Sequence, residues 1–307
     1  MENKAGKFGF STGTCAFASS RLCVIEDRLE LMPAKRMTFS FEEGEPITAV
    51  EHFLAEIKKF AGKHLFRIYF RGHGEPMNAL VPSIGRKHYY VGKSMLFDRN
   101  RERELLARFR RYAYEHFQRL PTEWETLFLA RHHGLPTRLL DWTANPLVAL
   151  YFAAFYDNDE VVYRETEAKN FSTVKLNLNG TVWAIERRAE TRHDLNVLTE
   201  RRSPLQIPGI KLVYPFNPSP RMSAQSGMFT LLGDPWTDMA KAADETFPTN
   251  TLDISRLTRW SVTARNKLQI IIDLERLAVN SRTLFPDLDG LAKGLYQTEI
   301  IREITKG

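Results

Sequence analysis

The chain has 307 residues, which allows one large domain or two modest ones, and its 43% hydrophobic content suits a protein with a substantial core. The net charge of +6 and the pI near 9.2 permit an anionic partner, such as a nucleic acid or a nucleotide, without requiring one. Cys15 and Cys23 form neither a CxxC pair nor a Cys/His spacing for a metal, so we expect no disulfide framework and no metal site. Because no apolar run is long enough for a signal sequence or a membrane span, we expect a cytoplasmic protein without membrane contact.

The first 60 residues show short strand patterns and one helix. Met37, Phe39 and Phe41 alternate with polar residues, which is typical of a strand. From Pro46 onward, an apolar period of 3.6 residues predicts an amphipathic helix. We expect residues 1–60 to pack as strands and a helix on the main domain.

A strand is predicted over Leu65–Phe70, and it leads directly into Arg71 and Gly72. Such a strand end presents a guanidinium group and a bare backbone. The guanidinium suits bidentate binding of phosphate or carboxylate, and glycine permits close approach of a ligand. The alternative is an ordinary turn with a surface arginine.

An arginine-rich helix is predicted from Asn100 to Phe117. Arg101, Arg108 and Arg111 lie on it, with few acidic residues to offset them and with tyrosines close in sequence. Clustered cations with aromatic side chains are typical of a surface that binds single-stranded nucleic acid. A solvated helix face explains the same pattern.

The next helix begins at a capping box formed by Thr122 and Glu125, and it ends at His132 and His133. Neighbouring helical residues point about 100° apart, so the two histidines are not expected to share one ligand. One of them is expected to pack or cap, and the other to face a site.

The stretch that follows contains many polar residues at positions that would otherwise be core. Gly134 and Pro136 bracket a tight turn, and Asn145 followed by Pro146 predicts the N-terminus of a helix, which suits an anion. The alternative is a buried structural turn whose polar groups satisfy one another. Between these signals lie Thr137, Arg138, Asp141, Trp142 and Thr143.

The remaining sequence alternates strand patterns and helices. A β-rich pattern between helical blocks predicts a single mixed α+β domain. The expected elements are strands at 180–186, 211–216, after Gly227 and at 268–274, and helices from Pro286 onward.

These motifs resemble the FRG-domain family, which is named for a Phe-Arg-Gly that stands here at Phe70, Arg71 and Gly72. The resemblance covers roughly residues 60–295 and implies an FRG domain over 61–295 with a helical tail over 296–307. Arg131 is a departure, because the family often has glutamine there. The further blocks are LVPSIGR (80–86), HGLPTRLLDWT (133–143), NPLVALYFA (145–153), RMSAQSGMF (221–229) and LFPDLDGL (284–291).

The order of these blocks is also similar to the remote layout of ADP-ribosyltransferases. That resemblance implies a β-rich ADP-ribosyltransferase-like core flanked by helices, with NAD as the substrate and no metal. In such enzymes an Arg-Gly on the first strand holds NAD, a Ser/Thr segment supports the nicotinamide half, and a late Glu or Gln segment orients the nucleophile. The expected acceptor is a macromolecule, RNA or DNA.

The resemblance assigns roles to individual residues. Arg71 would hold the NAD phosphates or ribose, and the backbone of Gly72 the nicotinamide amide. Gln225 stands at the late position. Since an amide is not a base, base catalysis would fall to His133, Asp141 or the acceptor itself. The other residues expected to contact NAD are Arg86, Thr137, Arg138, Trp142, Thr143, Asn145 and Arg221.

The family occurs in bacteria and phage-associated loci, so the resemblance implies a toxin or anti-phage defence effector with an antitoxin or regulatory protein as partner. We further expect the 70–74, 137–145 and 221–227 segments to converge on one cleft. Two other functions stay open, a non-enzymatic nucleic-acid binding module and an NAD glycohydrolase.

Overall fold

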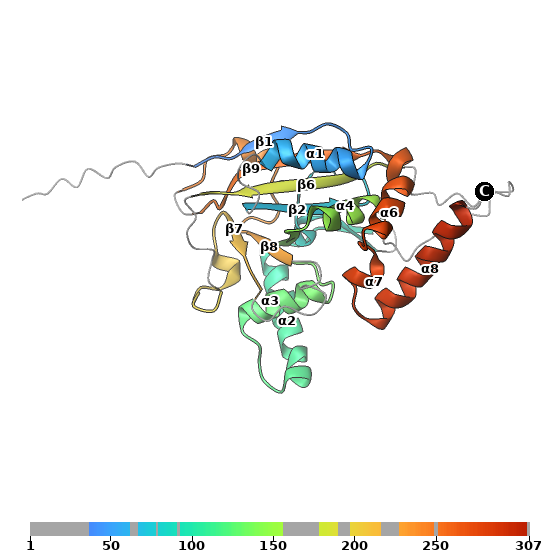
Figure 1. Cartoon of the computed structure of the whole chain (residues 1–307). Coiled ribbons are helices and arrows are strands. Elements are labelled where there is room, and N and C mark those ends of the chain that lie inside the picture. The colour runs from blue at the N-terminus through green and yellow to red at the C-terminus, as the bar shows by residue number, and fades with distance from the viewer. Residues whose placement is uncertain are drawn as a thin grey trace, which may run out of the picture. The chain divides into compact units, whose positions relative to one another are not determined.

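The computed structural model describes residues 37–61, 67–77, 79–90, 93–155, 178–189, 197–215, 227–248 and 251–305. These residues belong to one compact unit, Lys35–Gly307. They form a single α+β domain, and its centre is a seven-stranded mixed sheet (Figure 1). Across the sheet the strands are β1 (Ser40–Glu43), β9 (Ile254–Val262), β6 (Gly180–Arg187), β2 (Ile68–His73), β5 (Leu139–Thr143), β8 (Gly227–Leu232) and β7 (Ile210–Val213).

The strands pair antiparallel except for β1 and β9, which are parallel. β2 pairs with β6 along its whole length, whereas its register with β5 is limited to Phe70 opposite Thr143. A separate hairpin is formed by β3 (His88–Tyr90) and β4 (Lys93–Met95). The weak pairing of β2 with β5 leaves an interruption near the middle of the sheet.

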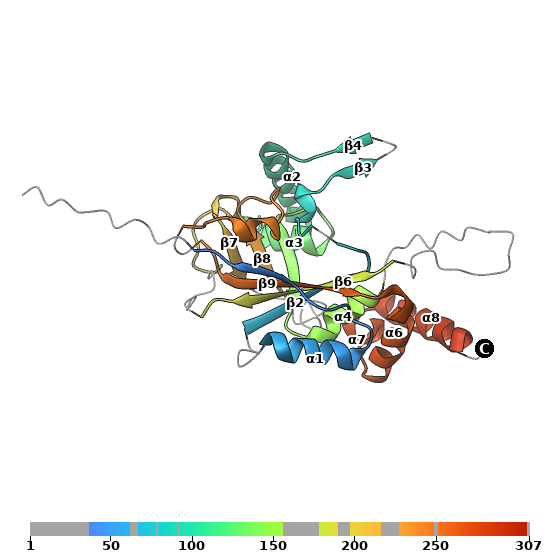
Figure 2. The same ribbon diagram turned by 90° about the horizontal axis from the view of Figure 1, so that it is seen from above.

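Three helices lie against one side of the sheet (Figure 2): α1 (Val50–Ala61), α4 (Pro146–Ala154) and α6 (Lys267–Arg276). Their apolar faces share one core with the strands, in which Phe53 of α1 contacts Phe70 and Trp260 edge to face. Each fully buried large apolar side chain stabilises the fold by roughly 1.5–3 kcal/mol. This core fixes the position of β2.

The other helices lie at two ends of the molecule. α2 (Arg99–Phe117) and α3 (Glu123–His132) pack on each other, and α3 joins a core with β5, β7 and β8. Figure 2 shows α2 and the β3–β4 hairpin across the sheet from α1. α7 (Ser281–Leu284) and α8 (Leu288–Thr305) form the last pair, and α8 continues across residue 295.

Several local expectations are confirmed. Thr122 and Glu125 form the capping box of α3, and Asn145 caps α4 with Pro146 in its first turn. Gly134 ends α3 with a φ of +80°, a conformation that L residues rarely adopt. These signals depend only on residues that are close in the sequence, and they can therefore be recognised from the sequence alone.

Other expectations are wrong. Residues 268–274 form helix α6 instead of a strand, because Ile270, Ile271 and Leu274 follow the helical period toward α4. β2 does not end at Phe70 but continues through Arg71 and Gly72. β9 was not among the strands expected from the sequence.

Among the described helices, none combines the length and the apolar content needed to cross a bilayer.

Candidate functional site

Arg71 links β2 to β5 where the two strands lose their regular pairing. Its side chain projects from the sheet face opposite Gly72, because successive strand residues alternate. Its Nη1 donates to the main-chain oxygen of Asp141 at 2.9 Å and to Asp141 Oδ2 at 3.2 Å. A guanidinium therefore supplies the β5 carbonyl with a donor in the interrupted part of the sheet.

Asp141 receives a second arginine from α3. Arg131 Nε donates to Asp141 Oδ1 at 3.0 Å, and Arg131 Nη2 contacts Oδ2. Burial would raise the pKa of Asp141, but the charges and hydrogen bonds of Arg131 and Arg71 lower it to about 2. Asp141 is thus a carboxylate at neutral pH and a very weak base.

Arg86 supplies a third guanidinium. Burial lowers its pKa to about 10, and the nearby positive charges of Arg71 and Arg131 act in the same direction. Its Nε donates to the oxygen of Val81 at 2.7 Å. All three guanidinium groups and Asp141 therefore lie within electrostatic reach of one another.

The short helix η2 (Ser83–Gly85) holds Arg86 in place. Ser83 Oγ accepts from the Thr137 amide at 3.0 Å and donates to the Thr137 oxygen at 3.2 Å. The Ile84 amide donates to the same oxygen at 3.2 Å. The 80–86 segment is therefore fixed against the residues that lead into β5.

His73 lies at the end of β2, beside the arginines. Burial, together with the charges of Arg71 and Arg86, lowers the pKa of His73 to about 4, so its imidazole is neutral at pH 7. Within the described residues, its buried Nδ1 has no hydrogen-bond partner. The same holds for the buried Nε of Arg71. Each of these nitrogens has capacity left for a ligand.

We name Arg71, His73, Arg86, Arg131 and Asp141 the arginine cluster. Three cations and one anion leave a formal excess of two positive charges, since His73 is neutral. The Asp141 side chain is 43% exposed, so solvent reaches the cluster. Surplus guanidinium groups at a solvent-accessible position suit a phosphate or carboxylate ligand.

Residues 66–161 match the family model described as the FRG domain. This segment of the chain is thus matched to the FRG domain. The matched segment contains every residue of the arginine cluster. No match was found among the curated proteins or among the solved structures.

Arg131 was not among the residues expected to form the site, and His73 was expected only as a member of the 70–74 segment, without a role of its own. Arg131 was visible only as a departure from the family's glutamine, and nothing in its local pattern indicates a contact with Asp141. His73 was visible only as the residue after Arg-Gly. A further unexpected residue is Lys267, which is completely buried and donates from Nζ to the Gly74 oxygen at 2.6 Å. It fixes the turn that follows His73.

Gly72 is explained by packing in the FRG domain. A Cβ atom at this position would lie 1.8 Å from the Ala149 oxygen of α4. The space over its Cα is therefore occupied by a helix, and the expectation that glycine leaves room there for a ligand is wrong. A role for its backbone in holding nicotinamide stays a prediction.

The expectation that Arg138 contacts NAD is corrected by the structure. Arg138 forms a bidentate ion pair with Glu102 of α2, at 2.9 Å and 2.6 Å, and both side chains are almost completely buried. Its Nη1 also donates to the Gly233 oxygen at 3.3 Å. Arg138 is therefore a structural connection between α2, β5 and the end of β8, and it does not pair with Asp141.

Four other expected NAD contacts have local structural partners. Trp142 is buried and donates from Nε1 to Thr230 Oγ1 at 2.9 Å, and Thr137 is buried beside Ser83. Thr143 Oγ1 accepts from the Asn145 amide at 3.0 Å. Asn145 Oδ1 accepts from the Leu147 amide at 3.0 Å, as an N-cap does. Contact of these four residues with NAD stays a prediction.

His133 lies apart from the arginine cluster. It follows α3, it is exposed, and its ring centroid lies 6.5 Å from that of Phe109 on α2. Residues two positions apart point in nearly opposite directions on a helix, and Arg131 already points to Asp141. The structure therefore does not bring His133 together with the other expected catalytic residues.

The late segment of the predicted site is only partly visible. Arg221 and Gln225 lie outside the described residues. Gly227, the first residue of β8, is paired with Thr143 of β5. The first two expected segments, 70–74 and 137–145, are thus brought together, while the position of the third stays a prediction.

The arginines expected to bind nucleic acid lie on the surface of α2. Arg101, Arg108 and Arg111 are exposed, and so are Tyr112 at 71% and Tyr114 at 52%. Exposed Glu104 and Glu115 share the helix and dilute its charge. The surface has both cations and aromatic rings, which a single-stranded nucleic acid needs.

Proposed function

We propose that this protein is a cytoplasmic ADP-ribosyltransferase that takes ADP-ribose from NAD and transfers it to a nucleic acid. The observation that carries the proposal is the gathering of Arg71, Arg86 and Arg131 around one carboxylate. Its surplus positive charge complements the diphosphate of NAD. The proposed setting is that of a toxin or anti-phage defence effector under the control of a partner protein.

In this proposal the arginines bind and orient NAD. Arg71 and Arg131 are prepositioned by Asp141, so their geometry does not have to be created when the ligand arrives. Within the described residues Arg86 forms no ion pair with Asp141, and it is the guanidinium most available to a phosphate. Preorganised donors of this kind contribute about 2.7–4 kcal/mol each to lowering a barrier.

The reaction breaks the bond between ribose C1′ and the nicotinamide nitrogen, and nicotinamide leaves with the bonding electrons. An acceptor oxygen or nitrogen forms the new bond at C1′ and loses a proton. The transition state resembles an oxocarbenium ion. Asp141, with a pKa of about 2, cannot serve as an effective base at neutral pH, so its role is to hold the arginines. Proton removal falls to the acceptor or to a residue outside the cluster.

The acceptor surface in this proposal is α2. Exposed Arg101, Arg108 and Arg111 would contact phosphates, and exposed Tyr112 would stack on a base. The same surface favours a second candidate function, a nucleic-acid binding module without enzymatic activity.

The test is incubation of the protein with labelled NAD and a mixture of RNA, DNA and protein. We expect label on RNA or DNA with the wild-type chain, a loss of about a hundredfold or more with Arg71→Ala, and no change with Arg265→Ala, an exposed arginine outside the cluster. Nicotinamide release without transfer would indicate a glycohydrolase. Nucleic-acid retention without NAD turnover would indicate the binding module, and label confined to protein would contradict the proposed acceptor.

A further inference from the structure

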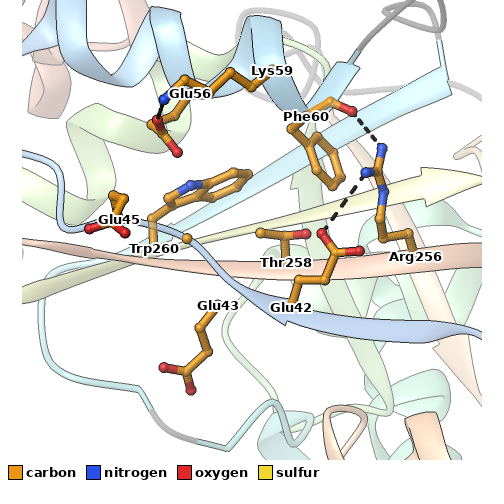
Figure 3. Close-up of a pocket in the computed structure, with 10 residues that line it drawn as sticks. Glu42, Glu43, Glu45, Glu56, Lys59, Phe60, Arg256, Thr258 and Trp260 are labelled. Atoms are coloured by element: carbon orange, nitrogen blue, oxygen red, sulfur yellow. Dashed lines mark hydrogen bonds and ion pairs between the residues drawn. The ribbon is translucent and has the colours of Figure 1, made fainter.

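A pocket of about 300 Å³ opens between β1, α1 and β9, on residues that the arginine cluster does not use (Figure 3). Trp260 of β9 is paired with Val182, which is paired with Gly72, so these three residues share one face of the sheet. Arg71 projects from the opposite face. The pocket is therefore separate from the proposed NAD site.

The floor of the pocket is formed by alternate residues of β9. Arg256, Thr258 and Trp260 project from the same face of the strand, toward α1. The buried atoms Arg256 Nε, Thr258 Oγ1 and Trp260 Nε1 each have no hydrogen-bond partner in the part of the chain that the structure describes. Buried polar atoms are nearly always paired, so three adjacent exceptions in one pocket indicate that an acceptor is missing.

The indole of Trp260 is held rigidly, with its buried N–H on the side of Glu56 (Figure 3). Trp260 is only 2% exposed, and its ring meets Phe53 and Phe60 edge to face at 6.0 Å and 5.5 Å. Gly44 lies beside the indole nitrogen, where an added Cβ would come within 2.0 Å of Nε1. A larger residue would clash with the indole and displace this donor, and glycine avoids the clash.

The rim of the pocket is acidic. Glu42, Glu45 and Glu56 line it together with Lys59 and Arg256, so three carboxylates against two cations leave a formal charge of −1. Glu43 points to the other face of the sheet, where it pairs with Arg259 (Figure 3). The hydrogen bond from Lys59, at 2.5 Å, is the main cause that lowers the pKa of Glu56. The nearby Trp260 indole also lowers the pKa of Glu56, although the indole Nε1 and the carboxylate do not meet the geometry of a hydrogen bond. Glu56 therefore remains ionised, and the rim attracts cations and repels anions.

We propose that this pocket binds a small organic cation that also carries a neutral hydrogen-bond acceptor, such as an amide or ester of a basic amino acid. The acceptor oxygen bonds to Trp260 Nε1 and Thr258 Oγ1, and the cationic group lies among the rim carboxylates. The face of Phe60 is already covered by the Arg256 guanidinium at 3.9 Å, so the cation is assigned to the rim. The volume lies at the lower end of ligand pockets, which suits a molecule of amino-acid size.

The test is calorimetric titration of the full chain with arginine amide, which has a cation and a carbonyl. Agmatine has the same guanidinium without the carbonyl, and we expect it to bind about tenfold more weakly. Glutamate should not bind. Absence of arginine amide binding at millimolar concentration overturns the proposal, and so does equal binding of agmatine or any binding of glutamate in this pocket.

Four variants test whether arginine amide binds in this pocket. Thr258→Val keeps the side-chain volume and removes the hydroxyl, and Glu56→Gln removes one rim charge; each should weaken arginine amide roughly tenfold. Ser261→Ala, on the other face of the same strand, is the matched control and should bind as the wild type does. Gly44→Ala should abolish binding while the melting temperature shows whether the variant is folded. Unchanged affinity in both Thr258→Val and Glu56→Gln overturns the proposal whatever Gly44→Ala does.

Discussion

Two arginine–carboxylate arrangements involve neighbouring positions of the chain: Arg138, which directly precedes β5, and Asp141, which lies on β5. They differ in burial and in charge balance. Arg138 and Glu102 are 3% and 1% exposed and form a closed pair of equal charge. Asp141 is 43% exposed and is shared by Arg71 and Arg131, with Arg86 nearby. The first arrangement has no donor capacity for a ligand, whereas the second has surplus cations that solvent can reach. An arginine in a polar motif is therefore a site candidate only when its charge is not already matched.

The largest expected effect comes from breaking the closed pair. Arg138→Met leaves Glu102 buried without its partner, and we expect a loss of about 3–5 kcal/mol in the free energy of unfolding, measured in urea. The double variant Arg138→Met/Glu102→Leu should regain most of that loss. A single variant as stable as the wild type would show that the pair is not a structural connection.

Acid should destabilise the folded protein through His73 of the arginine cluster. Its folded pKa of about 4 lies below the ordinary value of 6.5, so the unfolded chain binds more protons between these pH values. The contribution of neutral His73 to the free energy of unfolding is therefore fully present above about pH 6.5. It is lost as the pH drops toward 4, which lowers the free energy of unfolding by up to about 3 kcal/mol. Asp141, with a pKa of about 2, does not titrate in this window.

The measurement for this prediction is a series of urea unfolding curves between pH 7 and 4. His73→Asn should flatten the pH dependence in comparison with the wild type. An equal slope in both proteins would remove His73 as its cause.

The packing of α4 on β2 gives a smaller effect. Gly72→Ala places a methyl group against the Ala149 oxygen, and we expect a destabilisation of about 1–3 kcal/mol by thermal unfolding. Wild-type stability of Gly72→Ala would contradict the packing explanation.

Gly134→Ala has free space around its Cβ but a φ of +80°, so backbone strain alone should cost about 1–2 kcal/mol of stability.

The smallest effect concerns the exposed arginines of α2. Binding of single-stranded RNA should weaken with salt with a log-log slope of about −0.7 for each neutralised phosphate. Arg108→Glu combined with Arg111→Glu should flatten that slope, while Arg265→Glu serves as the charge-matched surface control. A slope unchanged by the double variant would exclude α2 as the binding surface.

The sequence predicts the parts of this fold that depend on neighbouring residues. The capping box at Thr122, the N-cap at Asn145 and the positive φ of Gly134 are all local signals. β9 was missed because its arginines and serines alternate with buried residues in a central strand, and only pairing with β1 and β6 explains them. Residues 268–274 were assigned to a strand because a short apolar run does not distinguish the two periods.

The candidate site was predictable in its residue types but not in its pairings. Arg71 and Asp141 were expected and do meet. Arg131 was missed because its contact with Asp141 depends on how α3 packs beside β5, and His73 because its lowered pKa depends on burial. Arg138 was assigned to the ligand because its partner Glu102 lies 36 positions away on α2. Local chemistry therefore identifies candidates, and tertiary pairing decides which of them are available.

The central claim is that the surplus guanidinium groups bind the diphosphate of NAD, and a calorimetric titration of NAD tests it most directly. Arg86→Gln is the sharpest variant, since Arg86 donates to the Val81 oxygen and forms no ion pair with Asp141 among the described residues. We predict that NAD binds the wild-type chain, that ADP competes while phosphate-free nicotinamide riboside does not, and that Arg86→Gln weakens NAD roughly tenfold or more. Absence of NAD binding to the wild-type chain, or equal affinity in Arg86→Gln, would contradict the account.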